Sequence, residues 1–312
     1  MIRRLTLILA VSLAAPTMAA DPAGIWAFRT GDVTLFKIAL RHRGPDWSAT
    51  WIRSSGFDVD ADGKLKTGGP IIKRTATEAH ANPDGTVEAS FDDPRPGATP
   101  DVFRIRPIDA RHAEAYYNGG RMGILLLARA TVKTRIDAWG RPRRLTYTAP
   151  DRDWPTNAEM TAMFTADQAD RNVPHIDWAA VGPRDQQRRA RTQQLIDAGA
   201  LHSGDDFLHA AFVFQHGSGP DDFLKAHILA TVAVARGNRG AIWIASATLD
   251  RYLQSIGQPQ ASGTQFSGRG GKWTQDPYNR TLISDALRQA LNVPPLDEQE
   301  AQRKRYEAAA KN

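Results

Sequence analysis

The sequence predicts two domains of different class: an antiparallel, barrel-like β domain over residues 21–150 and an all-α bundle of helical hairpins over residues 151–312. Three observations support this α+β assignment. A chain of 312 residues has room for about two domains of ordinary size. Apolar and polar residues alternate in the first half, and in the second half apolar residues recur at the spacing of helices.

The first twenty residues have the order of a secretory signal peptide. Arg3 and Arg4 precede an apolar stretch at 5–15, and small residues follow up to position 20. A membrane-spanning helix needs about twenty apolar residues, so we expect cleavage after Ala19 or Ala20 and no membrane span afterwards. The chain has no cysteine and therefore no site for amino-terminal lipid attachment. These features predict a bacterial periplasmic or secreted protein.

Charge and hydropathy exclude several classes of protein. Removing Arg3 and Arg4 with the signal leaves 38 basic against 34 acidic residues, a small and scattered excess that does not favour nucleic acid as a partner. The mean hydropathy of −0.44 excludes a polytopic membrane protein. An apolar content of 41% excludes a chain too polar to fold.

Seven or eight short strands are predicted in the β domain. Turn dipeptides with tolerance for positive φ, such as Asp62-Gly63, Asp84-Gly85 and Asn118-Gly119, separate them. Strands this short and this regularly spaced favour one closed or strongly curved antiparallel sheet. Besides a first strand that opens at residue 24, the candidates are 33–40, 47–52, 86–91, 102–106, 113–117, 123–129 and 144–148.

Two details of this domain resemble the lipocalin-type β barrel. Gly24-Ile25-Trp26 opens the first strand, and Arg129 ends a late apolar strand. In the lipocalin type an early Gly-x-Trp packs its indole under an arginine of the last strand. The resemblance implies a cavity for an apolar small molecule. The residues alone also allow a simpler interpretation, in which Trp26 is a core residue and Arg129 covers it through a cation–π contact.

The pattern becomes helical after the break at 151–155. Pro183 at a first helical position and Gly199 beyond the last predict a helix over 183–198. Two near-identical segments follow, and in each a serine, Ser203 or Ser218, precedes two aspartates as in a capped helix start.

These two segments predict helices that end at Gln215-His216-Gly217 and at Arg236-Gly237-Asn238. Further helices are expected over 240–256, 278–291 and 297–311. Short turns between them make the helices antiparallel neighbours. Only about one and a half hairpins are visible where a repeat array needs about three, so a compact bundle is at least as well supported as a TPR-like array.

Neither a metal nor another cofactor is predicted. Five of the eight histidines lie between positions 175 and 227, but no two have the i, i+4 spacing of H-E-x-x-H zinc sites. Gly271-Lys272 is followed by Trp273, so the phosphate-loop pattern of nucleotide hydrolases is not met.

The candidate ligand-binding residues of the helical domain lie at the end of one helix, near the end of a buried helix and in the loop that follows it. Antiparallel packing would bring these segments to the same end of the bundle and into one pocket. Two other roles stay open. Asp250 and Arg251 could be a purely structural ion pair, and Gln260 and Gln265 could serve only to form hydrogen bonds with buried backbone groups. The residues are Gln215, His216, Asp250, Arg251, Gln260, Thr264 and Gln265.

The same positions resemble a bacterial all-helical family of unknown function. Its marks are a Gln-His turn, an Asp-Arg pair and a Gln-x-x-Gly-Thr-Gln signature, which are matched here by Gln215-His216, Asp250-Arg251 and 260–265. The resemblance begins at Asp167-Gln168-x-x-Arg171 and extends to residue 296. Ala261-Ser262 departs from relatives that carry an aromatic residue there, which puts a ring-stacking role in doubt. The resemblance implies a helical fold and a site, but no reaction.

Two functions are consistent with the sequence. The first is an exported binding protein whose partner is a small polar ligand or a periplasmic protein. The alternative is a periplasmic hydrolase in which His216 acts as general base and Gln260, Gln265 or Arg251 orients the substrate.

Overall fold

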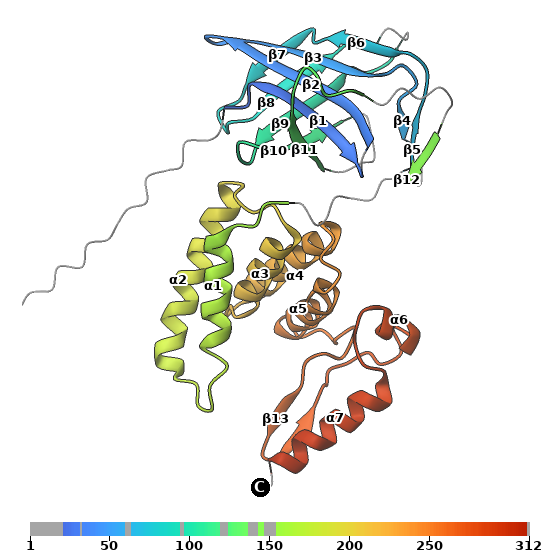
Figure 1. Cartoon of the computed structure of the whole chain (residues 1–312). Helices are drawn as coiled ribbons and strands as arrows, with labels where there is room; N and C mark the ends of the chain where they lie inside the picture. The colour runs from blue at the N-terminus through green and yellow to red at the C-terminus, as the bar shows by residue number, and fades with distance from the viewer. Residues whose placement is uncertain are drawn as a thin grey trace, which may run out of the picture. The chain divides into compact units, whose positions relative to one another are not determined.

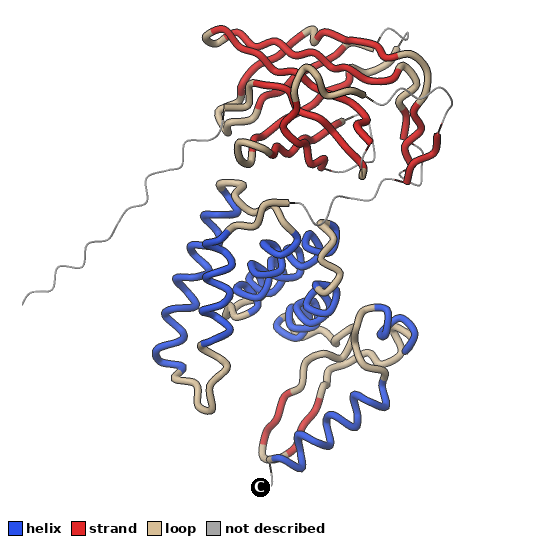
Figure 2. The backbone as a smooth tube through the Cα atoms, viewed as in Figure 1, coloured by secondary structure: helices blue, strands red, loops and turns tan. Residues whose placement is uncertain are grey.

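The computed structural model describes residues 21–31, 33–59, 64–93, 97–118, 124–136, 143–146 and 154–310. The predicted signal peptide and part of the predicted linker lie outside these ranges. The chain divides into two compact units, Met1–Tyr147 and Thr148–Asn312. The first unit consists of strands and the second mainly of helices, which confirms the predicted α+β class (Figure 1, Figure 2).

The β unit is built on one nine-stranded antiparallel sheet with the order β6-β3-β2-β1-β11-β10-β9-β8-β7. A smaller sheet, in the order β12-β5-β4, contains Arg143–Thr146, Lys64–Thr67 and Asp58–Val59. The strands of the large sheet are β1 Gly24–Thr30, β2 Val33–Arg43, β3 Asp46–Ser54, β6 Ile71–Thr75, β7 Glu78–Ala81, β8 Val87–Phe91, β9 Asp101–Pro107, β10 His112–Tyr117 and β11 Ile124–Ala130.

The two edges of this sheet are joined by one extended segment, 71–81. Its first part, β6, pairs with β3, and its second part, β7, pairs with β8. The transfer takes place where Ala76 N donates to Ala49 O at 2.9 Å and Thr77 N donates to Ser90 O at 2.8 Å. The sheet is therefore curled and barrel-like, with an up-and-down strand order compatible with a lipocalin-like barrel (Figure 1).

The sequence missed this joining segment. Its residues alternate between exposed and half-buried positions, and lysine, arginine, threonine and glutamate occupy many of them. The apolar alternation that marks the other strands is absent, because few of its side chains reach the core.

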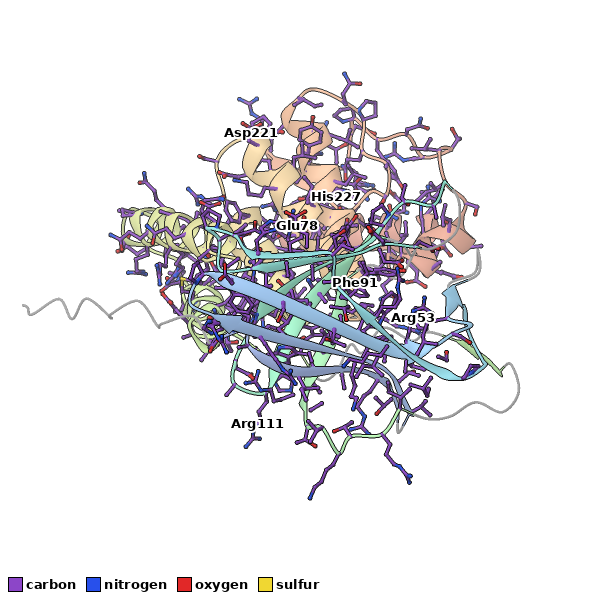
Figure 3. The ribbon with its side chains drawn as sticks, turned by 90° about the horizontal axis from the view of Figure 1, so that it is seen from above. Arg53, Glu78, Phe91, Arg111, Asp221 and His227 are labelled. Atoms are coloured by element: carbon purple, nitrogen blue, oxygen red, sulfur yellow. The ribbon has the colours of Figure 1, made fainter. Side chains whose placement is uncertain are left out.

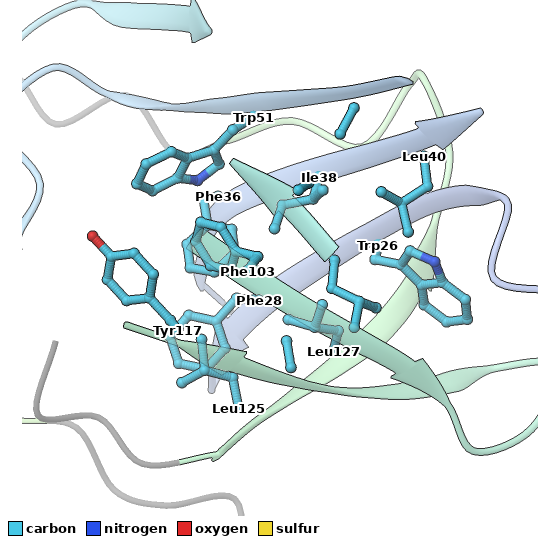
Figure 4. Packing of buried hydrophobic residues seen from close by; sticks show 14 of the residues in the cluster. Trp26, Phe28, Phe36, Ile38, Leu40, Trp51, Phe103, Tyr117, Leu125 and Leu127 are labelled. Carbon is cyan, nitrogen blue, oxygen red and sulfur yellow. The ribbon is translucent and has the colours of Figure 1, made fainter. Parts of the chain in front are cut away.

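Aromatic side chains fill the core of the curled sheet (Figure 4). The Trp51 ring packs against the rings of Phe36, Phe91, Phe103 and Tyr117, with centroids 4.9–6.0 Å apart. Full burial of each large apolar side chain contributes roughly 1.5–3 kcal/mol, so this cluster is the main source of stability in the unit.

The cation–π contact predicted for Arg129 is confirmed. Its Cζ lies 4.5 Å from the centroid of the buried Trp26 ring, and Trp26 and Arg129 are register partners on β1 and β11. Gly24 makes room for this arrangement, since its φ is +137° and a Cβ there would lie 2.5 Å from Arg129 Cζ.

The described part of the helical unit begins with the five helices α1 to α5 and ends in a mixed segment of two short strands and the helices α6 and α7. Helices α3, α4 and α5 pack on one another through alanine, leucine, valine and isoleucine side chains, with α1 and α2 beside them (Figure 1). Among the described residues no helix is both long and apolar enough to cross a lipid bilayer. The elements are α1 Ala158–Ala169, α2 Trp178–Asp197, α3 Gly204–Gln215, α4 Pro220–Ala235, α5 Ala241–Ser255, β13 Ser267–Arg269, β14 Lys272–Thr274, α6 Asp285–Ala290 and α7 Leu296–Ala309.

Several helix ends agree with the sequence patterns. Ser203 caps α3 in a capping box, accepting from Asp206 N at 3.0 Å while the Asp206 carboxylate accepts from Ser203 N. The predicted ends of α3 at Gln215 and of α5 before Gly257 are also confirmed.

Three helix predictions are wrong. Helix α2 starts at Trp178, capped by Asp177, so Pro183 lies inside the helix. Ser218 is not a cap, because Gly219 takes that position and Ser218 N instead donates to the Asp222 carboxylate. The helix expected over 278–291 is limited to α6, because backbone groups of residues 277 and 279 bond to Gln260. The β13–β14 hairpin is a further departure from an all-α unit.

Candidate functional site

The loop after α5 is organised around the carboxylate of Asp250. This side chain is fully buried, and its Oδ1 accepts from Ala261 N at 2.7 Å and Ser262 N at 2.9 Å. Oδ2 accepts from Thr264 N at 2.9 Å and from the Thr264 hydroxyl at 2.8 Å. Four donors therefore surround the carboxylate, which compensates its burial and fixes the path of the loop.

Gln260 braces the same loop from the inside. Its side chain is fully buried, and its amide nitrogen donates to Gln265 O at 2.9 Å and to Gln275 O. Its amide oxygen accepts from Gln265 N at 2.8 Å. Both N–H groups of the amide are thus used within the fold, so Gln260 positions Gln265.

Arg251 links the loop to the end of α3. Its Nε donates to Gln265 Oε1 at 3.2 Å, and its Nη1 donates to Gln215 O at 2.8 Å. Gln265 is held in turn, because its amide nitrogen donates to Ala247 O and to Thr264 Oγ1, each at 3.0 Å. The structure therefore brings Gln215, Arg251 and Gln265 together.

Among the residues that the structure describes, the guanidinium of Arg251 contacts only neutral groups. Besides Gln265 and Gln215, the guanidinium faces the ring of Phe223, 5.6 Å from its centroid. Burial, and then repulsion from Arg171, lowers the pKa of Arg251. Within the part of the chain that the structure describes, no carboxylate pairs with this guanidinium and no acceptor is bonded to Nη2.

His216, at the end of α3, is oriented by an aspartate from α1. Its Nδ1 lies 3.0 Å from Oδ1 of Asp167, which is 1% exposed, and its Nε2 lies 3.4 Å from the amide nitrogen of Gln215. A carboxylate at Nδ1 favours the tautomer that carries the proton there and leaves the Nε2 lone pair available. His216 O also accepts from Arg189 Nη1 at 2.9 Å, which ties α2 to this turn.

A balanced network of three arginines and three aspartates supports this pair. Asp167 accepts from Arg171 Nη1 at 3.0 Å, and Asp185 contacts Arg171 Nη2 at 2.5 Å. Each charge in the network has an opposite partner, in contrast to Arg251. The members are Arg171, Arg184, Arg188, Asp167, Asp170 and Asp185.

The candidate residues thus fall into two groups. Gln215, His216, Arg251 and Gln265 lie around one place, whereas Asp250, Gln260 and Thr264 hold the loop behind them. Reasoning from residue types did not single out Asp167 as the partner of His216. The only signal was the Asp167-Gln168-x-x-Arg171 pattern, since 49 positions separate Asp167 from the histidine.

Among the described residues no three His, Cys, Asp or Glu side chains are grouped so that they could hold a metal ion. Comparisons with protein-family models, with curated proteins and with solved structures found no match to this chain. The chemistry of the residues must therefore supply the evidence for function.

Proposed function

We propose that this is an exported binding protein whose helical unit holds a small anionic ligand, such as a carboxylate or a phosphate, against Arg251. The observation that carries the proposal is a largely buried guanidinium whose partners among the described residues are all neutral. A buried charge without a counter-charge is costly, so an anion at Nη2 would supply the missing partner.

The neighbouring side chains support this assignment. Gln265 and the carbonyl of Gln215 hold two edges of the guanidinium and leave Nη2 for a ligand. The side-chain amide of Gln215 stands beside the carbonyl to which Arg251 bonds, and its nitrogen can donate to a polar ligand, while His216 Nε2 can accept from one. Asp250 and Gln260 keep the loop in place without contributing a free donor.

A titration of the mature chain, residues 21–312, with acetate and with inorganic phosphate tests this proposal. Isothermal calorimetry gives the affinity, and the side-chain Nε–H resonances of arginine locate the anion. We expect Arg251→Gln to weaken binding at least tenfold. The matched variant Arg269→Gln, on the exposed β13 strand, removes the same charge and should leave binding unchanged. Equal binding by both variants, or no binding of either anion, would contradict the proposal.

A second candidate function is hydrolysis, which the Asp167–His216 pair favours. A histidine oriented by a buried carboxylate can take a proton from water with its Nε2. In that case Arg251 would hold the developing negative charge of the substrate. Turnover of p-nitrophenyl esters or phosphates that His216→Gln and Asp167→Asn abolish, with anion binding retained, would favour the enzyme. Anion binding without turnover would favour the binding protein.

The proposal also includes export of the protein and a relationship to two known families. The amino-terminal pattern supports cleavage before residue 20 or 21 and a periplasmic or secreted location, which sequencing of the mature protein after fractionation of bacterial cells would test. The Trp26–Arg129 contact supports a relationship to lipocalin-type barrels. The Gln-His turn and the loop at 260–265 support one to the helical family of unknown function.

A further inference from the structure

One end of the β unit carries two arginines above the aromatic core. Residues 49, 51 and 53 of β3 share a face, and Ala49 and Trp51 are buried, so Arg53 also points inward. Arg74 on β6 is the register partner of Trp51 and points to the same side. The Cζ atoms of Arg53 and Arg74 lie 4.5 Å and 5.4 Å from the Trp51 ring. Figure 3 labels Arg53 on β3 and Phe91 on β8.

The charge of Arg74 is fully compensated. It forms an ion pair with Asp101 and donates to Phe91 O at 2.9 Å. Asp101 also accepts from the hydroxyl of Tyr117 at 2.6 Å, and burial, followed by this hydrogen bond, raises the pKa of Tyr117. Arg74, Asp101 and Tyr117 therefore form a closed group.

Among the described residues of the β unit, no carboxylate forms an ion pair with Arg53. Its Nη1 donates to two backbone carbonyls, Ser54 O at 2.8 Å and Ser55 O at 3.0 Å. Its Nε is buried and has no hydrogen-bond partner. Burial, and then repulsion from Arg74, lowers the pKa of Arg53. The carboxylates of Asp101 and Asp93 act on this charge from a distance, but in the described part of the β unit neither forms an ion pair with it.

The unused donors of Arg53 lie on one edge of the guanidinium. Nη1 is bonded to carbonyls, so Nε and Nη2 remain, and together they present two parallel N–H groups. This edge matches the two oxygens of a carboxylate in a planar, bidentate pair. The indole of Trp51 beneath it and the half-buried ring of Phe57, 6.2 Å from that of Trp51, add an aromatic wall.

We propose that the β unit binds a small organic carboxylate at the Nε–Nη2 edge of Arg53, with its aromatic or apolar body beside Trp51 and Phe57. The site is separate from the anion site proposed at Arg251, since it rests on other residues in the other unit. Because Nε is covered, the anion reaches it through a small shift of the side chains around Arg53. Binding should therefore change the environment of Trp51.

A titration with benzoate, acetate and inorganic phosphate tests this site. It uses the mature chain carrying Arg251→Gln, so that the helical unit does not contribute, and it follows the arginine Nε–H and tryptophan Nε1–H resonances. We expect benzoate to shift the signals of Arg53 and Trp51 and to bind at least tenfold more tightly than phosphate. Arg53→Lys keeps the charge but loses the two-donor edge, and it should weaken benzoate binding at least tenfold.

Arg53→Gln removes both the charge and the two-donor edge, and Arg104→Gln is its matched control. Arg104 is exposed on β9, where its Nε donates to Glu88 Oε2 at 3.0 Å, so its loss should leave benzoate binding unchanged. The titration of the chain that keeps Arg53 tests the proposal by itself, so the test does not depend on whether Arg53→Gln folds. The proposal is overturned if benzoate leaves the Arg53 and Trp51 signals in place, if phosphate binds as tightly as benzoate, or if Arg53→Lys binds benzoate unchanged.

Discussion

Replacing Asp250 by asparagine should unfasten the loop after α5. The carboxylate accepts four hydrogen bonds, two at each oxygen, and is fully buried. Asparagine has nearly the same shape but presents an NH₂ group in place of one oxygen. If its oxygen faces Ala261 N and Ser262 N, its NH₂ meets the Thr264 N–H, and two donors then face one another.

The expected loss of stability follows from these contacts. The hydroxyl of Thr264 can turn to accept from the new NH₂, so one bond is recovered. The Thr264 N–H loses its acceptor, which costs about 1–3 kcal/mol, and the two remaining bonds become weaker because the acceptor is neutral. We expect Asp250→Asn to lower the free energy of unfolding by about 2–4 kcal/mol and Asp250→Ala by about 3–5 kcal/mol.

Urea unfolding of the full chain, followed by circular dichroism at 222 nm, measures this change, because the helices lie in the second unit. Asp221→Asn is the matched control. Asp221 is exposed in the first turn of α4, where its charge is worth about 0.3–1 kcal/mol (Figure 3). A loss for Asp250→Asn no larger than that of Asp221→Asn would refute the view that this carboxylate holds the loop.

Three further perturbations test other parts of the structure. Gly24→Ala should destabilise the β unit by about 1–3 kcal/mol, because φ is +137° and the new Cβ would meet the Arg129 guanidinium; tryptophan fluorescence during urea unfolding measures the loss. Hydrogen bonds from two arginines of α2 lower the pKa of Asp170 in the folded protein. The carboxylate therefore stabilises the fold fully above about pH 3.9, the pKa of an unfolded aspartate, and this stabilisation is lost as the pH falls through the lowered pKa of the folded state. Asp170→Asn should flatten the acid side of a plot of melting temperature against pH. Burial lowers the pKa of His209, whose ring stacks on Phe164 with centroids 4.2 Å apart. As the pH falls, the unfolded chain therefore binds a proton at this histidine before the folded chain does, and stability should begin to fall below about pH 6.5. A His209→Phe variant whose melting temperature fell in the same way would contradict this assignment.

Local patterns predicted most of the fold. Alternation located the strands that bury one face, and the Ser203 capping box and Gly257 marked helix ends correctly. Prediction failed where local preference was overridden by contacts distant in sequence. The bonds between Gln260 and residues 277 and 279 replaced the expected first turns of a helix, and the polar segment 71–81 became a strand because it closes the sheet.

The sequence by itself determined the two classes of domain, the Trp26–Arg129 contact and the set of polar residues at the end of the helical bundle. Only the tertiary structure decided which of them have free bonding capacity. Asp250 and Gln260 are saturated by their own loop, whereas Arg251 is left with neutral partners and His216 acquires Asp167. The same holds for the two arginines beside Trp51. Among the described residues, Arg74 is paired with Asp101, whereas Arg53 keeps a buried Nε without a hydrogen-bond partner. Residue type fixes what a side chain can donate or accept, but whether a partner stands within about 3 Å depends on the packing of segments far apart in the chain.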